Sequence, residues 1–140
     1  MPDISEELLR RVQGNEPAAL WEYSRLIEAN SPDEAYKFAV LAAQLNQPDA
    51  AMYLGDRCAQ EEKPDDAERY YRIGIKAGVA VCAVKLALIH LSKDEPTGLV
   101  ELEELAEMGE ISAAEALADY YKAHRNEVQY EYWSLRVKDE

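Results

Sequence analysis

Apolar and small residues recur along this 140-residue chain at separations of three, four and seven positions. Such spacing places side chains on one face of an α-helix. The pattern predicts a leading helix over residues 4–13, followed by pairs of helices. The first helices of these pairs, called A helices, are expected at 17–29, 49–62, 80–93 and 111–124. The second helices, called B helices, are expected at 32–46, 64–77, 96–108 and 126–138.

The helix pairs repeat with a period of about 32 residues. Proline is favourable at the first position of a helix, and three predicted B helices open on one: Pro32, Pro64 and Pro96. Glycine and asparagine tolerate the left-handed backbone conformation that often ends a helix. Residues of these two types are expected to close each unit: Gly14, Asn46, Gly78 and Gly109. The repeating unit is therefore a helical hairpin.

Small residues are expected at fixed places in each hairpin. Four positions beyond the turns stand Ala18, Ala50, Cys82 and Ala113. Four positions further come Glu22, Leu54, Leu86 and Leu117, of which only Glu22 interrupts an apolar column. The next position holds Tyr23, Gly55, Ala87 and Ala118, and the B helices share a small position at Ala35, Ala67 and Gly98. Small side chains in register let the two helices of a pair approach closely.

These observations predict an all-α fold, a right-handed α–α solenoid of about four helical hairpins preceded by an N-terminal capping helix. The predicted repeats lie near 15–46, 47–78, 79–109 and 110–140, in a single domain over residues 1–140. A chain of this length can bury a core without disulfides or metal. In the leading helix, Ser5 is placed to cap the first turn.

One hairpin carries a motif, Ala50-x3-Leu54-Gly55-x2-Cys58 followed by Ala67-x3-Tyr71-x2-Gly74-x3-Gly78. It resembles the tetratricopeptide and Sel-one-like repeat superfamily, and the resemblance covers roughly residues 14–138. Spacing within a hairpin is similar to the tetratricopeptide pattern, whereas the link between hairpins is similar to the shorter Sel-one-like link. The chain lacks the glycine-containing insertion of the Sel-one-like family, so both names stay open. The resemblance implies a concave groove, made chiefly by the A helices, that holds peptide or protein ligands.

Transferring the superfamily's groove positions by these columns predicts eleven partner-binding residues. They are Leu20, Trp21, Ser24, Met52, Tyr53, Asp56, Val84, Lys85, Leu88, Glu115 and Asp119. Aromatic residues and methionine commonly anchor interfaces. A second interpretation is that Trp21 and Tyr53 fill space between adjacent A helices, and both interpretations stay open.

The formal net charge of −13 argues against nucleic acid and anionic membranes as partners, because both repel an acidic surface. Acidic residues dominate between Lys93 and Lys122, where no lysine or arginine occurs. This stretch is interpreted either as a solvated face that aids solubility or as a face that steers a basic partner. No apolar run approaches the ~20 residues that span a bilayer, and the first residues lack the features of a signal peptide. We therefore expect a cytoplasmic protein.

The sequence offers no constellation typical of catalysis, and we expect no cofactor and no metal. His90 has no cysteine or carboxylate at zinc-finger spacing, and His124, the other histidine, stands near the end of the last predicted A helix. Cys58 and Cys82 fall in packing positions, where a thiol is usually inert. The paired carboxylates of the chain are expected on solvated faces, where nothing raises a pKa. An enzyme is therefore the least favoured class of function.

Taken together, the sequence predicts a non-enzymatic protein–protein interaction module or adaptor that binds a peptide or protein segment in its groove. The alternative is a small acidic inhibitor or immunity protein that covers a basic partner such as a toxin. The last helix carries Tyr130, Tyr132, Trp133, Leu135 and Val137 with no following hairpin to cover it. We expect a monomer, or a weak dimer formed through this helix.

Overall fold

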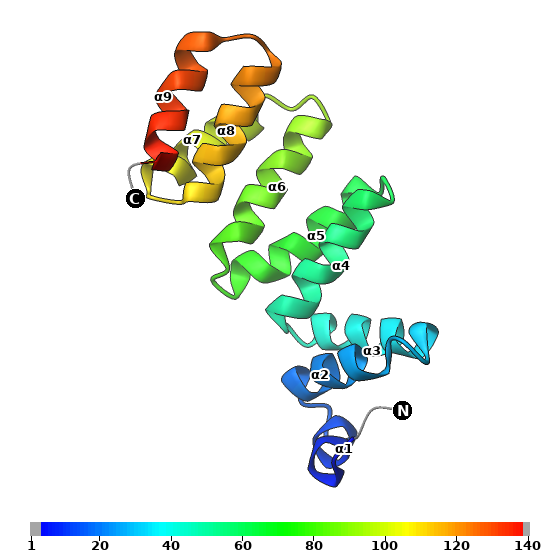
Figure 1. Cartoon of the computed structure of the whole chain (residues 1–140). Helices are drawn as coiled ribbons and strands as arrows, with labels where there is room; N and C mark the ends of the chain where they lie inside the picture. The colour runs from blue at the N-terminus through cyan, green and yellow to red at the C-terminus, as the bar shows by residue number, and fades with distance from the viewer. Residues whose placement is uncertain (1–3, 139–140) are drawn as a thin grey trace. The chain divides into compact units, whose positions relative to one another are not determined.

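The computed structural model of the chain describes residues 4–138 (Figure 1). Within that range every regular element is an α-helix, and short loops join consecutive helices. The helices are α1 (Glu6–Gln13), α2 (Pro17–Ile27), α3 (Pro32–Gln44), α4 (Pro48–Gln60), α5 (Pro64–Lys76), α6 (Ala80–Ser92), α7 (Thr97–Glu107), α8 (Ile111–Ala123) and α9 (Glu127–Lys138). The all-α prediction is confirmed for the described residues, and the predicted helix boundaries agree within two residues.

The helix starts follow from local chemistry. Proline stands in the first turn of four helices, at Pro17, Pro32, Pro48 and Pro64. Its fixed φ suits the helix, and the amide hydrogen that it lacks would have no partner within the helix at that position. Pro96 instead precedes the first residue of α7, which begins at Thr97. In α1 the predicted cap is present, because Ser5 Oγ accepts a hydrogen bond from the Leu8 amide at 3.1 Å.

The turns that close the units show the repeat spacing directly. Four residues before A helices have left-handed φ angles: Asn15 (57°), Asn46 (70°), Gly78 (90°) and Gly109 (97°). Their separations are 31, 32 and 31 residues. Gly14, which the sequence analysis placed in this set, has an ordinary φ of −82°. Asn15 is therefore the turn residue of the first repeat, and the predicted register there is wrong by one residue.

The same shift corrects the packing columns of α2. Ala18 and Glu22 are exposed, whereas Ala19 and Ser24 are fully buried. The buried small residues of the A helices are thus Ala19, Ala50, Cys82 and Ala113 in one column, and Ser24, Gly55, Ala87 and Ala118 in the other. Glu22 does not interrupt an apolar column.

The contacts divide the chain into two compact units, Met1–Val79 and Ala80–Glu140. We call them the N-terminal unit, with α1 to α5, and the C-terminal unit, with α6 to α9. The division lies one residue after the predicted boundary between the second and third repeats. The single domain over residues 1–140 stays a prediction.

In the N-terminal unit each helix packs against the next one along the chain, from α1 to α5. Small residues bring the members of each pair together. Ser24 Oγ of α2 donates a hydrogen bond to the carbonyl of Ala35 in α3 at 2.6 Å. A β-carbon on Gly55 of α4 would lie 2.6 Å from the ring of Tyr71 in α5. The core is made mainly of alanine and leucine: Leu20, Ala39, Ala42, Ala43, Ala50, Ala51 and Leu54.

In the C-terminal unit α6 packs on α7, α7 on α8 and α8 on α9, and α6 also contacts α8. The contact between α6 and α8 places two A helices side by side. Gly98 of α7 approaches α6 so closely that a β-carbon there would lie 2.7 Å from the carbonyl oxygen of Ala87. The buried core of this unit is Val84, Ala87, Leu102, Ala113, Ala114, Leu117, Ala118 and Trp133.

Candidate functional site

The predicted partner-binding residues fall into three classes of exposure. Leu20, Ser24 and Val84 are buried, and Leu20 and Val84 belong to the cores of their units. The half-buried residues are Trp21, Met52, Tyr53, Asp56 and Lys85. The exposed residues are Leu88, Glu115 and Asp119. A partner cannot reach the three buried side chains in this conformation, so we leave them out of the candidate surface.

The structure brings Trp21 of α2 and Tyr53 of α4 together, with ring centroids 5.4 Å apart. The Arg25 guanidinium carbon lies 4.3 Å from the centroid of the Trp21 ring and 4.1 Å from that of Tyr53. A guanidinium at this distance is attracted to an aromatic face. We call these three residues the aromatic–arginine cluster. Its rings pack against the core yet stay partly exposed, so they both fill space between A helices and present a surface.

Glu28, just beyond the end of α2, fixes the polar groups of this cluster. It forms an ion pair with Arg25 and accepts a hydrogen bond from the Tyr53 hydroxyl at 3.4 Å. Arg25 Nη2 also donates to Ser24 Oγ at 3.3 Å. Arg25 Nε is buried and has no hydrogen-bond partner among the described residues. Buried donors without an acceptor are rare in folded proteins, so the Arg25 guanidinium retains an unused capacity to donate a hydrogen bond.

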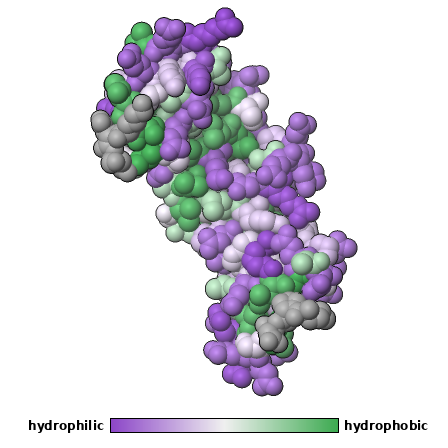
Figure 2. All heavy atoms as spheres, viewed as in Figure 1, coloured by the Kyte–Doolittle hydropathy of each residue, from purple (hydrophilic) through white to green (hydrophobic). Residues whose placement is uncertain are grey.

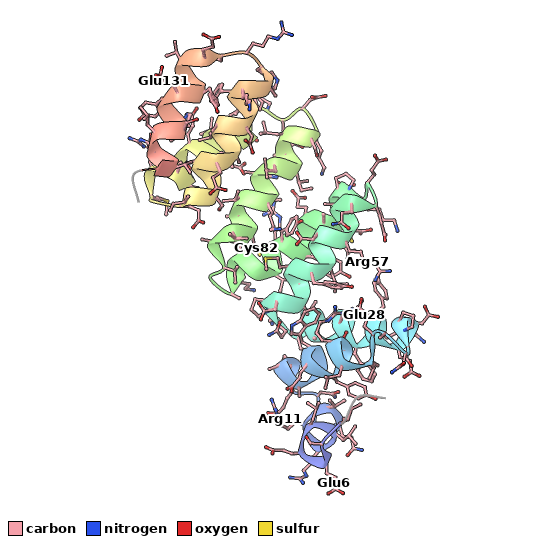
Figure 3. All side chains as sticks on the ribbon, in the orientation of Figure 1. Glu6, Arg11, Glu28, Arg57, Cys82 and Glu131 are labelled. Carbon is pink, nitrogen blue, oxygen red and sulfur yellow. The ribbon has the colours of Figure 1, made fainter. Side chains whose placement is uncertain are left out.

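A cavity of about 470 Å³ adjoins the cluster. Its volume falls in the range of about 300–1,000 Å³ that is typical of ligand sites. Residues of α2, α3 and α4 and of the α2–α3 loop line it, and two of them, Glu28 and Arg57, are labelled in Figure 3. The charged and aromatic members are Arg25, Glu28, Asp33, Tyr36, Lys37, Tyr53 and Arg57. Three of these residues are basic and two are acidic, so the lining of this cavity carries a net positive charge although the chain is acidic.

A smaller cavity of about 110 Å³ shares Tyr36 and Arg57 with the first one. The Arg57 guanidinium carbon lies 4.9 Å from the centroid of the Tyr36 ring, and Arg57 Nε lies 3.4 Å from Glu61 Oε2. Hydrogen bonds from Lys63 and Arg57 hold the pKa of Glu61 below its usual value. Arg57 and Lys63 therefore both pair with Glu61, and all three side chains are largely exposed.

Cys58 also lines this smaller cavity. Burial raises the pKa of its thiol, and the negative charges of Asp66 and Glu61 raise it further. The thiolate is the nucleophilic form of cysteine, so a raised pKa lowers reactivity at neutral pH. The surroundings of Cys58 therefore disfavour nucleophilic chemistry.

In the C-terminal unit the histidine and the acidic stretch that the sequence singled out are connected. His90 Nδ1 of α6 lies 2.9 Å and 3.0 Å from the two carboxylate oxygens of Glu101 in α7. Glu103 accepts a hydrogen bond from the Tyr121 hydroxyl at 3.4 Å. Burial is the main cause that raises the pKa of Tyr121, and the nearby Glu103 carboxylate raises it further. Glu104, Glu107, Glu115 and Asp119 are exposed. The acidic stretch thus contains both structural carboxylates and surface carboxylates.

The side chains and helix lengths of residues 4–138 bear on metal-binding groups and on membrane-spanning helices only. That range holds no group of three or more histidine, cysteine, aspartate or glutamate side chains arranged to bind a metal ion. None of its helices is both long and apolar enough to cross a membrane.

Arg25 is the residue that the sequence analysis missed, and the register explains why. Correct alignment makes Arg25 equivalent to Asp56, Leu88 and Asp119, because each follows the buried small residue of its A helix. The shifted register assigned that place to Ser24. The 31-residue spacing of Pro17 and Pro48 is the signal that could have corrected it.

Comparisons of the chain with protein-family models, with curated proteins and with solved structures found no match.

Proposed function

We propose that this chain is a non-enzymatic protein-interaction module that holds a peptide or protein segment against the A-helix face of its N-terminal unit. The observation that carries the proposal is the aromatic–arginine cluster, Trp21, Arg25 and Tyr53, beside a cavity of about 470 Å³. Tryptophan, tyrosine and arginine are the residues that most often dominate binding energy at interfaces. Here they are held together before any partner arrives, which reduces the cost of ordering them on binding.

The finer architecture belongs to the same proposal. We infer a right-handed α–α solenoid in which the pairs α2–α3, α4–α5, α6–α7 and α8–α9 are successive repeats. The turn spacing of 31, 32 and 31 residues and the packing within each pair support it. The resemblance to tetratricopeptide and Sel-one-like repeats agrees with a partner-binding role in the cytoplasm.

The C-terminal helix supports a monomer or a weak dimer. Val128, Tyr132 and Leu135 are exposed on α9 at spacings of four and three, so they share one face of the helix. Figure 2 shows apolar residues, in green, at the surface of the C-terminal unit. Three side chains make a small patch, which suits weak self-association rather than an obligate interface.

An inhibitor or immunity protein that covers a basic partner is the second candidate. The exposed carboxylates of Glu104, Glu107, Glu115 and Asp119 in the C-terminal unit favour it. Opposite charges speed the encounter of two proteins, and salt screens that gain.

The experiment is affinity capture from the native cell with three immobilised proteins. Wild type is compared with a Trp21→Ala, Tyr53→Ala double variant and with Met108→Ala, which removes an exposed apolar side chain at the end of α7 as a control. We expect the double variant to lose partners that wild type and the control retain, because anchors contribute more to binding than to folding. Circular dichroism must show that helix content is preserved. An identical set of captured proteins from all three would refute the proposed function.

A further inference from the structure

A second large cavity, of about 630 Å³, lies within the C-terminal unit. Its walls come from the last turns of α6 and α8, from the α6–α7 loop and from the start of α7. Its lining includes three leucines and a tyrosine: Leu88, Leu91, Leu99 and Tyr120. Leu88 is 42% exposed, so the cavity is open to solvent.

This cavity occupies the same place in its repeat as the cavity beside the aromatic–arginine cluster. Arg25, Tyr36 and Arg57 line the cavity of the N-terminal unit, and Leu88, Leu99 and Tyr120 stand 63 positions after them, two repeats along. Both arginines are thus replaced by apolar or aromatic residues. The two cavities are alike in position and different in chemistry.

The aromatic wall of the second cavity is fixed in place before binding. The Tyr120 ring stacks on the His124 ring, with centroids 4.0 Å apart and planes 24° apart. His124 Nδ1 donates a hydrogen bond to the Tyr120 carbonyl at 2.8 Å. The Tyr121 and Tyr120 rings form an edge-to-face pair, with centroids 5.2 Å apart. A wall held in this way costs little to order when a ligand enters.

The electrostatic surroundings favour a cation beside this apolar cavity. Asp94 and Glu95 are exposed and line it from the α6–α7 loop. The C-terminal ends of α6 and α8 lie at the cavity, and the carboxyl end of a helix is the negative end of its dipole. Among the described residues, those that line the cavity include neither lysine nor arginine. Apolar walls and a negative rim together suit an aliphatic side chain with positive charge close by.

We propose that this cavity docks an aliphatic side chain carried on a basic segment of a partner protein. The inference rests on the proposed function and deepens it by giving one partner contact a defined chemistry. The leucines and Tyr120 cover the aliphatic group, and Asp94 and Glu95 attract the lysine or arginine that flanks it.

The probe is a short synthetic peptide with one central leucine flanked by arginine and lysine. Nuclear magnetic resonance of the full chain follows the titration. We expect the amide signals of Leu88, Leu99 and Tyr120 to shift and to saturate. Replacing the central leucine of the peptide by serine should weaken binding by about tenfold or more, because burying a leucine side chain is worth at least that factor. A peptide with glutamate in place of its basic residues should also bind more weakly.

Variants of the chain locate the contact. Leu88→Ser should weaken binding of the leucine peptide by about tenfold, whereas Leu9→Ser, which changes an exposed leucine on α1, should leave the affinity unchanged. A double variant, Asp94→Asn with Glu95→Gln, should weaken binding at low salt and reduce its salt dependence, because those charges act through screened attraction. Equal affinity for the leucine and serine peptides, or an unchanged affinity of Leu88→Ser, would overturn the inference.

This outcome is separable from failure of the proposed function. The Trp21→Ala, Tyr53→Ala variant should bind the leucine peptide as wild type does, because both residues lie in the other unit. If that variant loses native partners while the peptide fails to bind wild type, only the proposal that the second cavity docks an aliphatic side chain is refuted. If the peptide binds through Leu88 while capture of native partners is unaffected by the double variant, only the role of the aromatic–arginine cluster is refuted.

Discussion

Single side chains decide how closely the helices of a pair approach. Gly55 and Gly98 each stand where a β-carbon would overlap the neighbouring helix, on the ring of Tyr71 in one case and on the backbone of α6 in the other. Tyr71 is buried and its hydroxyl donates to Asp56 at 2.6 Å, so its ring cannot move aside without breaking a hydrogen bond. The hairpin geometry therefore depends on glycine at both places.

The first prediction is that Gly98→Ala destabilises the chain by about 1–3 kcal/mol, the usual cost of overpacking a close contact. The added β-carbon would lie 2.7 Å from the carbonyl oxygen of Ala87, and a helix backbone yields little. Gly14→Ala is the control, since a β-carbon there meets only atoms at 3.6 Å and the φ of −82° suits alanine. Urea unfolding measures both. A Gly98→Ala chain as stable as Gly14→Ala would contradict the close approach of α6 and α7.

The second prediction concerns the thiol of Cys58. Its raised pKa leaves less thiolate at a given pH than an ordinary cysteine has, so labelling by a thiol reagent should be slow near neutral pH and should accelerate as pH rises. The measurement uses a Cys82→Ala background to follow one thiol. Asp66→Asn removes a charge that raises this pKa and should speed labelling. Labelling as fast as that of an unstructured cysteine peptide would contradict the described surroundings.

At the scale of the helices, the sequence predicts well because repeated chemistry marks each start and end. Prolines and periodic small residues indicated the helices of the repeats, and Ser5 with the apolar residues after it indicated α1. The first repeat was misplaced because Gly14 and Asn15 are adjacent and both tolerate a left-handed conformation, which only Asn15 adopts. The turn itself does not distinguish two suitable neighbours, whereas the 31-residue spacing of Pro17 and Pro48 elsewhere in the sequence does.

The third prediction tests the buried column of the A helices. Leu54 is 1% exposed in the core of the N-terminal unit, so Leu54→Asp places a carboxylate where no water reaches it. Burying such a group costs several kcal/mol, a large part of a total stability of about 5–15 kcal/mol. Leu45→Asp, at an exposed leucine, should leave the melting temperature nearly unchanged. Similar thermal melts for the two variants would show that the column is misassigned.

At the scale of the whole chain, two repeats with one backbone plan carry different surface chemistry. The net charge of −13 alone suggests a uniformly acidic molecule, yet three cations line the cavity beside Trp21 and Tyr53. The sequence identified both aromatic residues because their type is typical of interfaces. It missed Arg25 and included the buried Leu20 and Ser24, because one shifted position exchanges surface and core residues on a helix. It also included Val84, whose column is more exposed in the neighbouring repeats, at Met52 and Glu115. The sequence also did not predict charge pairing between helices, such as that of His90 with Glu101.

The fourth prediction concerns Arg25, the member of the aromatic–arginine cluster that stacks on both rings. If the cluster anchors a partner, Arg25→Ala should weaken binding of that partner by about tenfold or more, since arginine anchors at interfaces commonly contribute at least that factor. Arg72→Ala is the matched control: Arg72 is an exposed arginine of α5 in the same unit. Its loss should change affinity little.

The most direct test of the central claim is a titration of the partner recovered by affinity capture against wild type, Arg25→Ala and Arg72→Ala, with thermal melts of all three chains. The account predicts a dissociation constant at least about tenfold higher for Arg25→Ala, an unchanged constant for Arg72→Ala, and three folded proteins. Equal dissociation constants for wild type and Arg25→Ala would contradict the assignment of the aromatic–arginine cluster as the binding site.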